Sequence, residues 1–111
     1  MIMVRILILD PDENHAGALA LALTQRNFAV TMAPLDEAAG APLDQPLGEF
    51  AVIVLDLSLD RPTDWELLDS VSKLVRSEVS RPMVLCLSRV YRGPGTKLAV
   101  ERRGARLVYE L

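Results

Sequence analysis

Hydrophobic side chains in this 111-residue chain form short runs that are separated by longer, more polar segments. Runs that are apolar at almost every position and rich in β-branched residues are typical of strands covered on both faces of a parallel sheet. They predict five strands, at residues 4–9, 28–32, 50–57, 82–87 and 105–109. The longest purely apolar runs fall far below the roughly 18 residues that cross a bilayer, so we expect no contact with a membrane.

The segments between these runs predict helices. Residues 13–26 are rich in Ala and Leu, and Asp10 and Pro11 suit the cap and first turn of a helix. Thr63 or Asp64 is expected to cap a second helix, because apolar residues then recur at helical spacing, at Leu67, Leu68, Val71, Leu74 and Val75. Thr96 would cap a short third helix that runs to Arg103, and Gly104 would end it. Residues 36–39 predict one turn at most, since prolines and glycines follow.

Strands that alternate with helices predict an α/β fold with a parallel sheet. We expect a single domain over residues 1–111, with a flavodoxin-like, doubly wound, five-stranded parallel sheet in the order 2-1-3-4-5. Sites in such sheets form beyond the carboxyl ends of the strands, at the switch point between the first and third strands. Asp10 and Asp56 end these two strands, so we expect them to be neighbours.

Two carboxylates held side by side repel each other, and a bound cation offsets that repulsion. Oxygen ligands suit Mg²⁺, which commonly bridges protein carboxylates to a phosphoryl group and can neutralise charge during phosphoryl transfer. Asp56 as nucleophile and Asp10 as metal ligand therefore form a chemically coherent pair.

The chain resembles receiver domains of response regulators, of the chemotaxis-protein type, over nearly its whole length. The resemblance is carried by Ile6-Leu7-Ile8-Leu9-Asp10, Val52-Ile53-Val54-Leu55-Asp56-Leu57-Ser58, Glu66-Leu67-Leu68, residues 82–88 and Gly104-Ala105. It implies a two-component phosphorelay in which Asp56 accepts phosphate from a histidine kinase, a phosphotransfer protein or a small donor. It further implies that Asp10, Asp56 and the backbone carbonyl of Ser58 bind Mg²⁺, that Ser88 is the switch hydroxyl, and that the signal leaves through protein contacts.

The chain also departs from this family's pattern. Pro11 replaces a second acidic residue, which should weaken Mg²⁺ binding, and Asp12 is a further candidate ligand. Leu111 falls where the family has a lysine that pairs with the phosphoryl group. The fifth helix, which covers one sheet face in the family, is expected to be lacking. An uncovered apolar face implies self-association, a downstream protein partner, or truncation from a longer protein.

Three functions are compatible with these residues. The first is the phosphorylated receiver, a signalling module and not an enzyme. The second is a pseudo-receiver that keeps the fold and acts as a binding or dimerisation module without phosphorylation. The third, more remote, is a haloacid-dehalogenase-like phosphatase, because Asp10-Pro11-Asp12 resembles its D-x-D motif, although Asn14 does not fit that motif.

Charge and single residues refine these expectations. Residues 1–72 hold 12 acidic and 3 basic side chains, and residues 73–111 hold 3 acidic and 9 basic ones. The basic segment favours an acidic protein partner. Direct nucleic-acid binding is not expected, because aromatic residues are few and the isoelectric point is about 5.1. Without a signal-peptide pattern, a cytoplasmic location is expected. Cys86 is expected in the core, and His15, the one histidine, at the surface rather than in a metal site.

Overall fold

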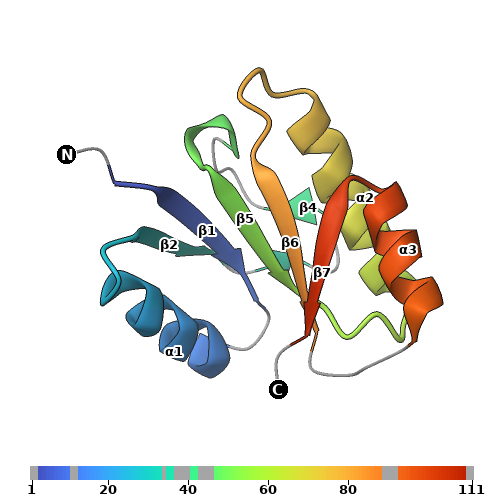
Figure 1. Cartoon of the computed structure of the whole chain (residues 1–111), viewed down its shortest axis with the longest axis horizontal. Helices are drawn as coiled ribbons and strands as arrows, with labels where there is room; N and C mark the ends of the chain where they lie inside the picture. Colours follow the sequence, from blue (N-terminus) through green and yellow to red (C-terminus); the bar gives the residue numbers. More distant parts are fainter. Residues whose placement is uncertain are drawn as a thin grey trace.

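A parallel sheet of five strands forms the centre of the molecule in the computed structural model (Figure 1). The structure describes residues 3–10, 13–33, 35–36, 41–42, 47–88 and 93–109. The strands of this sheet, in chain order, are β1 (Arg5–Leu9), β2 (Ala29–Ala33), β5 (Val52–Asp56), β6 (Met83–Ser88) and β7 (Ala105–Tyr109). Their order in space is β2-β1-β5-β6-β7 and all pairs are parallel, which confirms the predicted order.

Helices lie on both faces of the sheet (Figure 1). Helix α1 (Glu13–Thr24) covers one face at β1 and β2, whereas α2 (Pro62–Arg76) and α3 (Pro94–Arg102) cover the opposite face. The larger core lies under α2 and α3, because the fully buried side chains of Leu7, Ile53 and Leu68 meet there. A smaller cluster under α1 includes Ile6, Ile8 and Val54. The alternation along each strand therefore supplies two apolar layers, as a doubly wound sheet requires.

The stretch between β2 and β5 differs from the predicted helical turn. A short antiparallel pair forms there, β3 (Leu35–Asp36) with β4 (Ala41–Pro42), and the 3₁₀ helix η1 (Leu47–Glu49) follows. The prediction of a turn at residues 36–39 is wrong at Asp36, which belongs to β3; residues 37–39 lie outside the described residues. The prolines and glycines of this stretch argue against a regular helix, but they do not specify the short strands and the 3₁₀ helix that form among its described residues.

Two predicted helix caps are also wrong. Helix α2 begins at Pro62 with Arg61 as its N-cap, so Thr63 and Asp64 lie inside the first turn. Helix α3 begins at Pro94 after Gly93, so Thr96 is not its cap. A proline in the first turn needs no partner for an N–H group, and its φ is already helical. In both helices the proline therefore indicates the first turn better than the polar residues that were predicted as caps. The predicted end of α3 is confirmed, because Gly104 follows with a φ of 83°.

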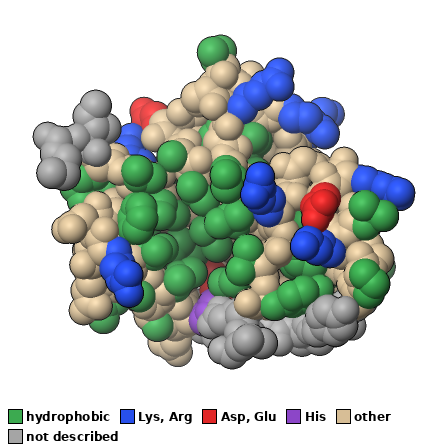
Figure 2. Space-filling view, in the orientation of Figure 1, with side chains coloured by type: hydrophobic (Ala, Val, Ile, Leu, Met, Phe, Trp, Pro, Cys, Tyr) green, Lys and Arg blue, Asp and Glu red, His purple; other side chains and the backbone are tan. Residues whose placement is uncertain are grey.

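One sheet face is only partly covered by the described residues. Beyond the edge of α1, apolar side chains from β1, β5, β6 and β7 form a broad surface patch (Figure 2). A hollow of about 280 Å³ on this face is lined only by apolar residues, Val4, Ile6, Leu19, Leu23, Phe28, Val52, Val54, Leu85, Leu87 and Val108. We refer to these ten residues as the open apolar face. Among the described residues, no helix is both long and apolar enough to cross a membrane.

Candidate functional site

The acidic residues of the candidate site lie at the ends of two neighbouring strands. Asp56 is the last residue of β5, and Asp10 directly follows β1, its neighbour in the sheet. In both strands the alternation of side chains places the aspartate on the α1 face, after Ile6 and Ile8 in β1 and after Val54 in β5. The side chain of Asp10 is 1% exposed and that of Asp56 is 15% exposed. The two carboxylates therefore meet at the carboxyl edge of the sheet, as the predicted strand order requires.

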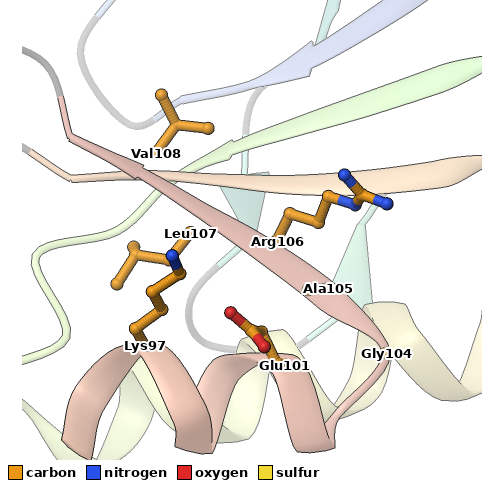
Figure 3. Close-up of a pocket in the computed structure, with 7 residues that line it drawn as sticks. All are labelled: Lys97, Glu101, Gly104, Ala105, Arg106, Leu107 and Val108. Carbon is orange, nitrogen blue, oxygen red and sulfur yellow. The ribbon is translucent and has the colours of Figure 1, made fainter. Parts of the chain in front are cut away.

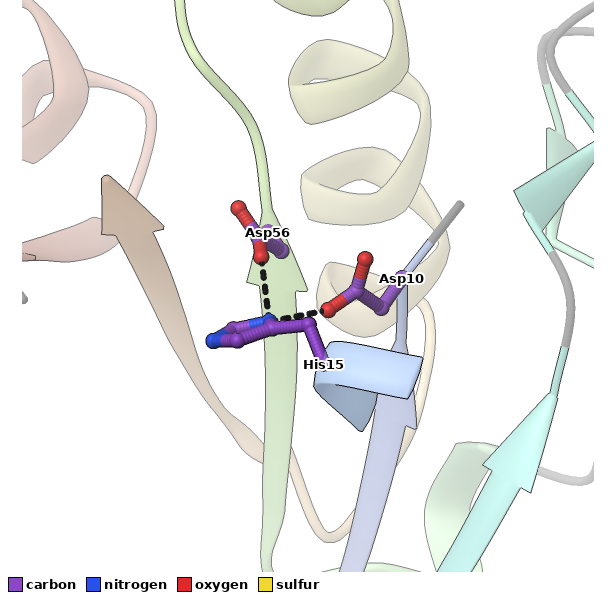
Figure 4. A group of neighbouring side chains, drawn as sticks. All are labelled: Asp10, His15 and Asp56. Atoms are coloured by element: carbon purple, nitrogen blue, oxygen red, sulfur yellow. Dashed lines mark hydrogen bonds and ion pairs between the residues drawn. The ribbon is translucent and has the colours of Figure 1, made fainter. Parts of the chain in front are cut away.

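His15 joins these two carboxylates (Figure 4). Its Nδ1 lies 2.6 Å from Oδ2 of Asp10 and 2.7 Å from Oδ2 of Asp56. Because an ionised carboxylate only accepts hydrogen bonds, Nδ1 is assigned as the donor, with one proton facing both oxygens. The prediction that His15 lies at the surface, outside any site, is wrong: its side chain is 14% exposed and occupies the first turn of α1.

The three residues form a group with the geometry of a candidate metal site. One donor atom from each of Asp10, His15 and Asp56 lies within 4.8 Å of the other two. The position of His15, five residues after the strand-end aspartate and in the first turn of the next helix, was available from the sequence. The direction of its side chain was not, because no sequence pattern specifies which side of the first helical turn faces the sheet edge.

Asp64 organises the loop that follows Asp56. Its carboxylate, 1% exposed, accepts hydrogen bonds from the Leu59 backbone N–H at 3.1 Å and the Ser58 hydroxyl at 3.0 Å. It also accepts one from the Arg61 guanidinium at 3.1 Å. Leu59 is buried with a φ of 63°, a left-handed conformation that is uncommon for leucine. Asp64 therefore stabilises the loop instead of capping its helix.

Trp65 contacts both this loop and Arg103, which lies at the carboxyl end of α3. Its indole Nε1–H donates to the Leu59 carbonyl at 3.3 Å, and the Arg103 guanidinium lies 4.7 Å from its ring centroid. Arg103 also donates to the exposed carboxylate of Asp69 at 2.7 Å. Trp65 is therefore placed to report changes in the loop after Asp56.

The sequence also predicted Ser88 and the backbone carbonyl of Ser58 as parts of the site. Ser88 is buried at the carboxyl end of β6, one position beyond the partner of Asp56 in the sheet register. In the alternation of β6 it follows Val84 and Cys86, which belong to the core under α2 and α3. The role of Ser88 as the switch hydroxyl stays a prediction, as does the role of the Ser58 backbone carbonyl as a metal ligand. Pro11, Asp12 and Leu111 lie outside the described residues.

Cys86 is a core residue close to the site, as predicted. It is fully buried in β6, and burial raises the pKa of its thiol to about 12, with further contributions from the negative charges of Asp56 and Asp64. The thiol therefore stays protonated at neutral pH, which makes it a poor nucleophile.

This burial predicts a loss of stability in alkaline solution. The unfolded chain releases the thiol proton from about pH 9.0, whereas the folded chain keeps it up to about pH 12. The contribution of Cys86 is thus fully present below pH 9 and is lost as the pH rises toward 12. We expect the stability advantage of the wild type over Cys86→Ala to shrink by about 1 kcal/mol per pH unit above 9. Urea unfolding of both proteins at pH 8, 9 and 10 measures this, and a constant difference would contradict the assignment.

Comparisons with known proteins identify the fold. No protein-family model and no curated protein sequence matches the chain. Among solved structures, a putative pilus assembly protein (CpaE) from Burkholderia thailandensis has a TM-score of 0.76 at 21% identity, over 96% of this chain and 85% of that one. The receiver domain of the histidine kinase CKI1 from Arabidopsis thaliana, complexed with Mg²⁺ and BeF₃⁻, has a TM-score of 0.71 at 14% identity, over 96% and 80%.

A third solved structure carries a modified aspartate. This response regulator protein from Burkholderia pseudomallei, with a phosphorylated aspartic acid and a calcium ion, has a TM-score of 0.66 at 26% identity, over 96% of this chain and 58% of that one. The chain therefore has the flavodoxin-like fold of response regulator receiver domains, with three α-helices among its described residues.

Proposed function

We propose that this protein is a signalling receiver that accepts a phosphoryl group on Asp56. The observation that carries the proposal is the convergence of Asp56 and Asp10 on one point, the Nδ1 of His15, at 2.7 and 2.6 Å. Such a pair at the carboxyl edge of a parallel sheet is suited to holding a cation beside a nucleophilic carboxylate. The solved neighbours that carry BeF₃⁻ or a phosphorylated aspartate support this proposal.

The donor atoms suit a divalent cation. The carboxylates of Asp10 and Asp56 would hold it, with the Ser58 carbonyl as the further ligand expected from sequence, and Mg²⁺ is the ion expected with oxygen ligands. When bound, such an ion neutralises negative charge on an incoming phosphoryl group. The imidazole nitrogen at the same point is not a typical Mg²⁺ ligand, so an ion that also binds His15 is expected to differ from Mg²⁺.

The chemical step is a phosphoryl transfer. A carboxylate oxygen of Asp56 would attack the phosphorus of a phosphohistidine or of acetyl phosphate, forming an O–P bond as the P–N or P–O bond to the donor breaks. The leaving imidazole or acetate keeps the electron pair of the broken bond. Asp56 is accessible for this attack because part of its side chain is exposed. A histidine kinase or phosphotransfer protein is the donor partner that this chemistry implies.

The output surface that we propose lies at the edge strand β7. A hollow of about 630 Å³ is formed there by α3 and β7, and Lys97, Glu101 and Arg106 are among its lining residues (Figure 3). The contacts from Leu59 through Trp65 to Arg103 lead from the loop after Asp56 to the carboxyl end of α3. A rearrangement of that loop would therefore reach this hollow, where the exposed cationic side chains suit an acidic protein partner.

Beryllofluoride, a mimic of the phosphoryl group, tests the proposal. With Mg²⁺ present, we expect it to change the fluorescence of Trp65, and acetyl phosphate to label the protein once per chain. Asp56→Asn should abolish both results, because the amide oxygen is not a nucleophile of comparable strength. Glu49→Gln, a change at an exposed carboxylate paired with Arg5, is the matched control and should keep both. Labelling that persists in Asp56→Asn, or is absent from the wild type, would refute the proposal.

A second candidate function is a binding or dimerisation module that needs no phosphate. Two observations favour it: His15 already bridges the two aspartates, and the open apolar face is a surface on which a second copy or another protein can dock. This candidate predicts no response to beryllofluoride, together with a molecular mass in solution that rises with protein concentration. Light scattering with and without beryllofluoride separates the two functions.

A further inference from the structure

The candidate site offers two kinds of donor atom. Asp10 and Asp56 contribute carboxylate oxygens from the ends of two strands, and His15 contributes an imidazole nitrogen from the first turn of α1. Figure 4 shows that Nδ1 points toward both carboxylates, whereas the other ring nitrogen points away from them. The nitrogen is thus placed on the same side of the site as the two oxygens, where one ion can contact all three.

The chemistry of this donor set distinguishes between cations. Mg²⁺ is a hard ion that takes oxygen ligands and keeps several waters, whereas Zn²⁺, Co²⁺ and Ni²⁺ bind imidazole well. Three protein donors with the remaining positions open is also the usual arrangement of Zn²⁺ sites that bind a water or a substrate. An imidazole in contact with both carboxylates therefore favours borderline transition-metal ions over Mg²⁺.

We propose that Asp10, His15 and Asp56 form a site for a borderline divalent transition-metal ion, of which Zn²⁺ is the representative. The inference rests on the proposed function to the extent that the ion would occupy the cation position beside the phosphoacceptor. Binding removes the proton from Nδ1, which moves to Nε2 or to solvent, and the metal–nitrogen bond takes its place. The ion keeps positions open for water or for a phosphoryl oxygen.

The distances allow this exchange with a small movement. Ligand atoms about 2.1 Å from one ion lie about 3 to 3.5 Å from each other. The Nδ1 atom is now 2.6 and 2.7 Å from the two oxygens, so the donors need to separate by less than about 1 Å. The His15 side chain is partly exposed and stands at the start of a helix, where a change of side-chain torsion provides that movement.

Nuclear magnetic resonance of the imidazole provides a direct test in the wild-type chain. His15 is the one histidine of the sequence, so a protein without an affinity tag gives one set of imidazole ¹⁵N signals. We expect added Zn²⁺ to shift the Nδ1 signal strongly at one equivalent, and Mg²⁺ to leave it nearly unchanged. A Zn²⁺ titration that does not affect the Nδ1 signal would overturn the inference.

Calorimetric titration with Zn²⁺, Co²⁺ and Mg²⁺ measures the preference. We expect the wild type to bind Zn²⁺ and Co²⁺ at least tenfold more tightly than Mg²⁺, and His15→Ala to lose at least tenfold in affinity for both while its Mg²⁺ affinity does not fall. His15→Gln, which keeps a polar side chain at the position, is the second variant in case His15→Ala does not fold. Equal affinities for Zn²⁺ and Mg²⁺, or unchanged Zn²⁺ binding in a folded His15 variant, would overturn the inference.

These titrations are independent of the phosphorylation test. A chain that responds to beryllofluoride with Mg²⁺ but shows no shift of the Nδ1 signal with Zn²⁺ keeps the proposed function and contradicts the metal preference. A chain that binds Zn²⁺ through His15 but is not labelled by acetyl phosphate in the presence of either ion keeps the metal site and contradicts the receiver activity.

Discussion

Replacing Asp64 with alanine is expected to lower the free energy of unfolding by about 3 kcal/mol. The buried carboxylate accepts hydrogen bonds from the Leu59 backbone, the Ser58 hydroxyl and the Arg61 guanidinium. Alanine would leave the Leu59 N–H without this acceptor in a buried environment, at a cost of about 1 to 3 kcal/mol, and would also remove a charged hydrogen bond. Urea unfolding followed by circular dichroism measures the loss.

Asp69→Ala on the same helix is the matched control. Its carboxylate pairs with Arg103 at the surface, and exposed pairs contribute about 0 to 1 kcal/mol. Asp64→Asn keeps one acceptor oxygen and should fall between the two. If Asp64→Ala and Asp69→Ala proved equally stable, the loop after Asp56 would not depend on Asp64, and its left-handed Leu59 would need another support.

The sequence predicted the sheet because its strands are simple to recognise. Residues 52–56 are apolar up to an aspartate, and a strand of this kind can only be buried on both faces, which in turn requires helices on either side. The strand order then places Asp10 and Asp56 at one edge. The two carboxylates of the site were predictable for that reason, since their positions follow from the backbone of two adjacent strands.

The residues whose roles could not be predicted from the sequence are positioned by local geometry. His15 belongs to the site because the first turn of α1 faces the sheet edge, and no periodic pattern specifies that direction. Asp64 looked like a helix cap because aspartate is common there, but its acceptor oxygens are used by a loop whose shape depends on the φ of Leu59. Both errors concern polar side chains, whose partners are set by tertiary contacts rather than by propensity.

Two leucines in neighbouring strands test how much apolar burial on each face of the sheet contributes to stability. Leu55 in β5 is fully buried under α2, whereas Leu85 in β6 lies on the open apolar face. We expect Leu55→Ala to cost about 3 to 4 kcal/mol, because it removes buried surface and leaves a cavity. Leu85→Ala should cost about 1 kcal/mol or less, since water can enter the space that it leaves.

The same pair of variants shows whether a second copy covers the open apolar face. If Leu85 were buried by self-association, its replacement would cost nearly as much as that of Leu55, and the unfolding midpoint of the wild type would rise with protein concentration. Leu55→Ala would show the same concentration dependence as the wild type, because Leu55 does not face that surface. A small cost for Leu85→Ala with a midpoint independent of concentration would show that this face is free in the isolated chain and available to a different protein.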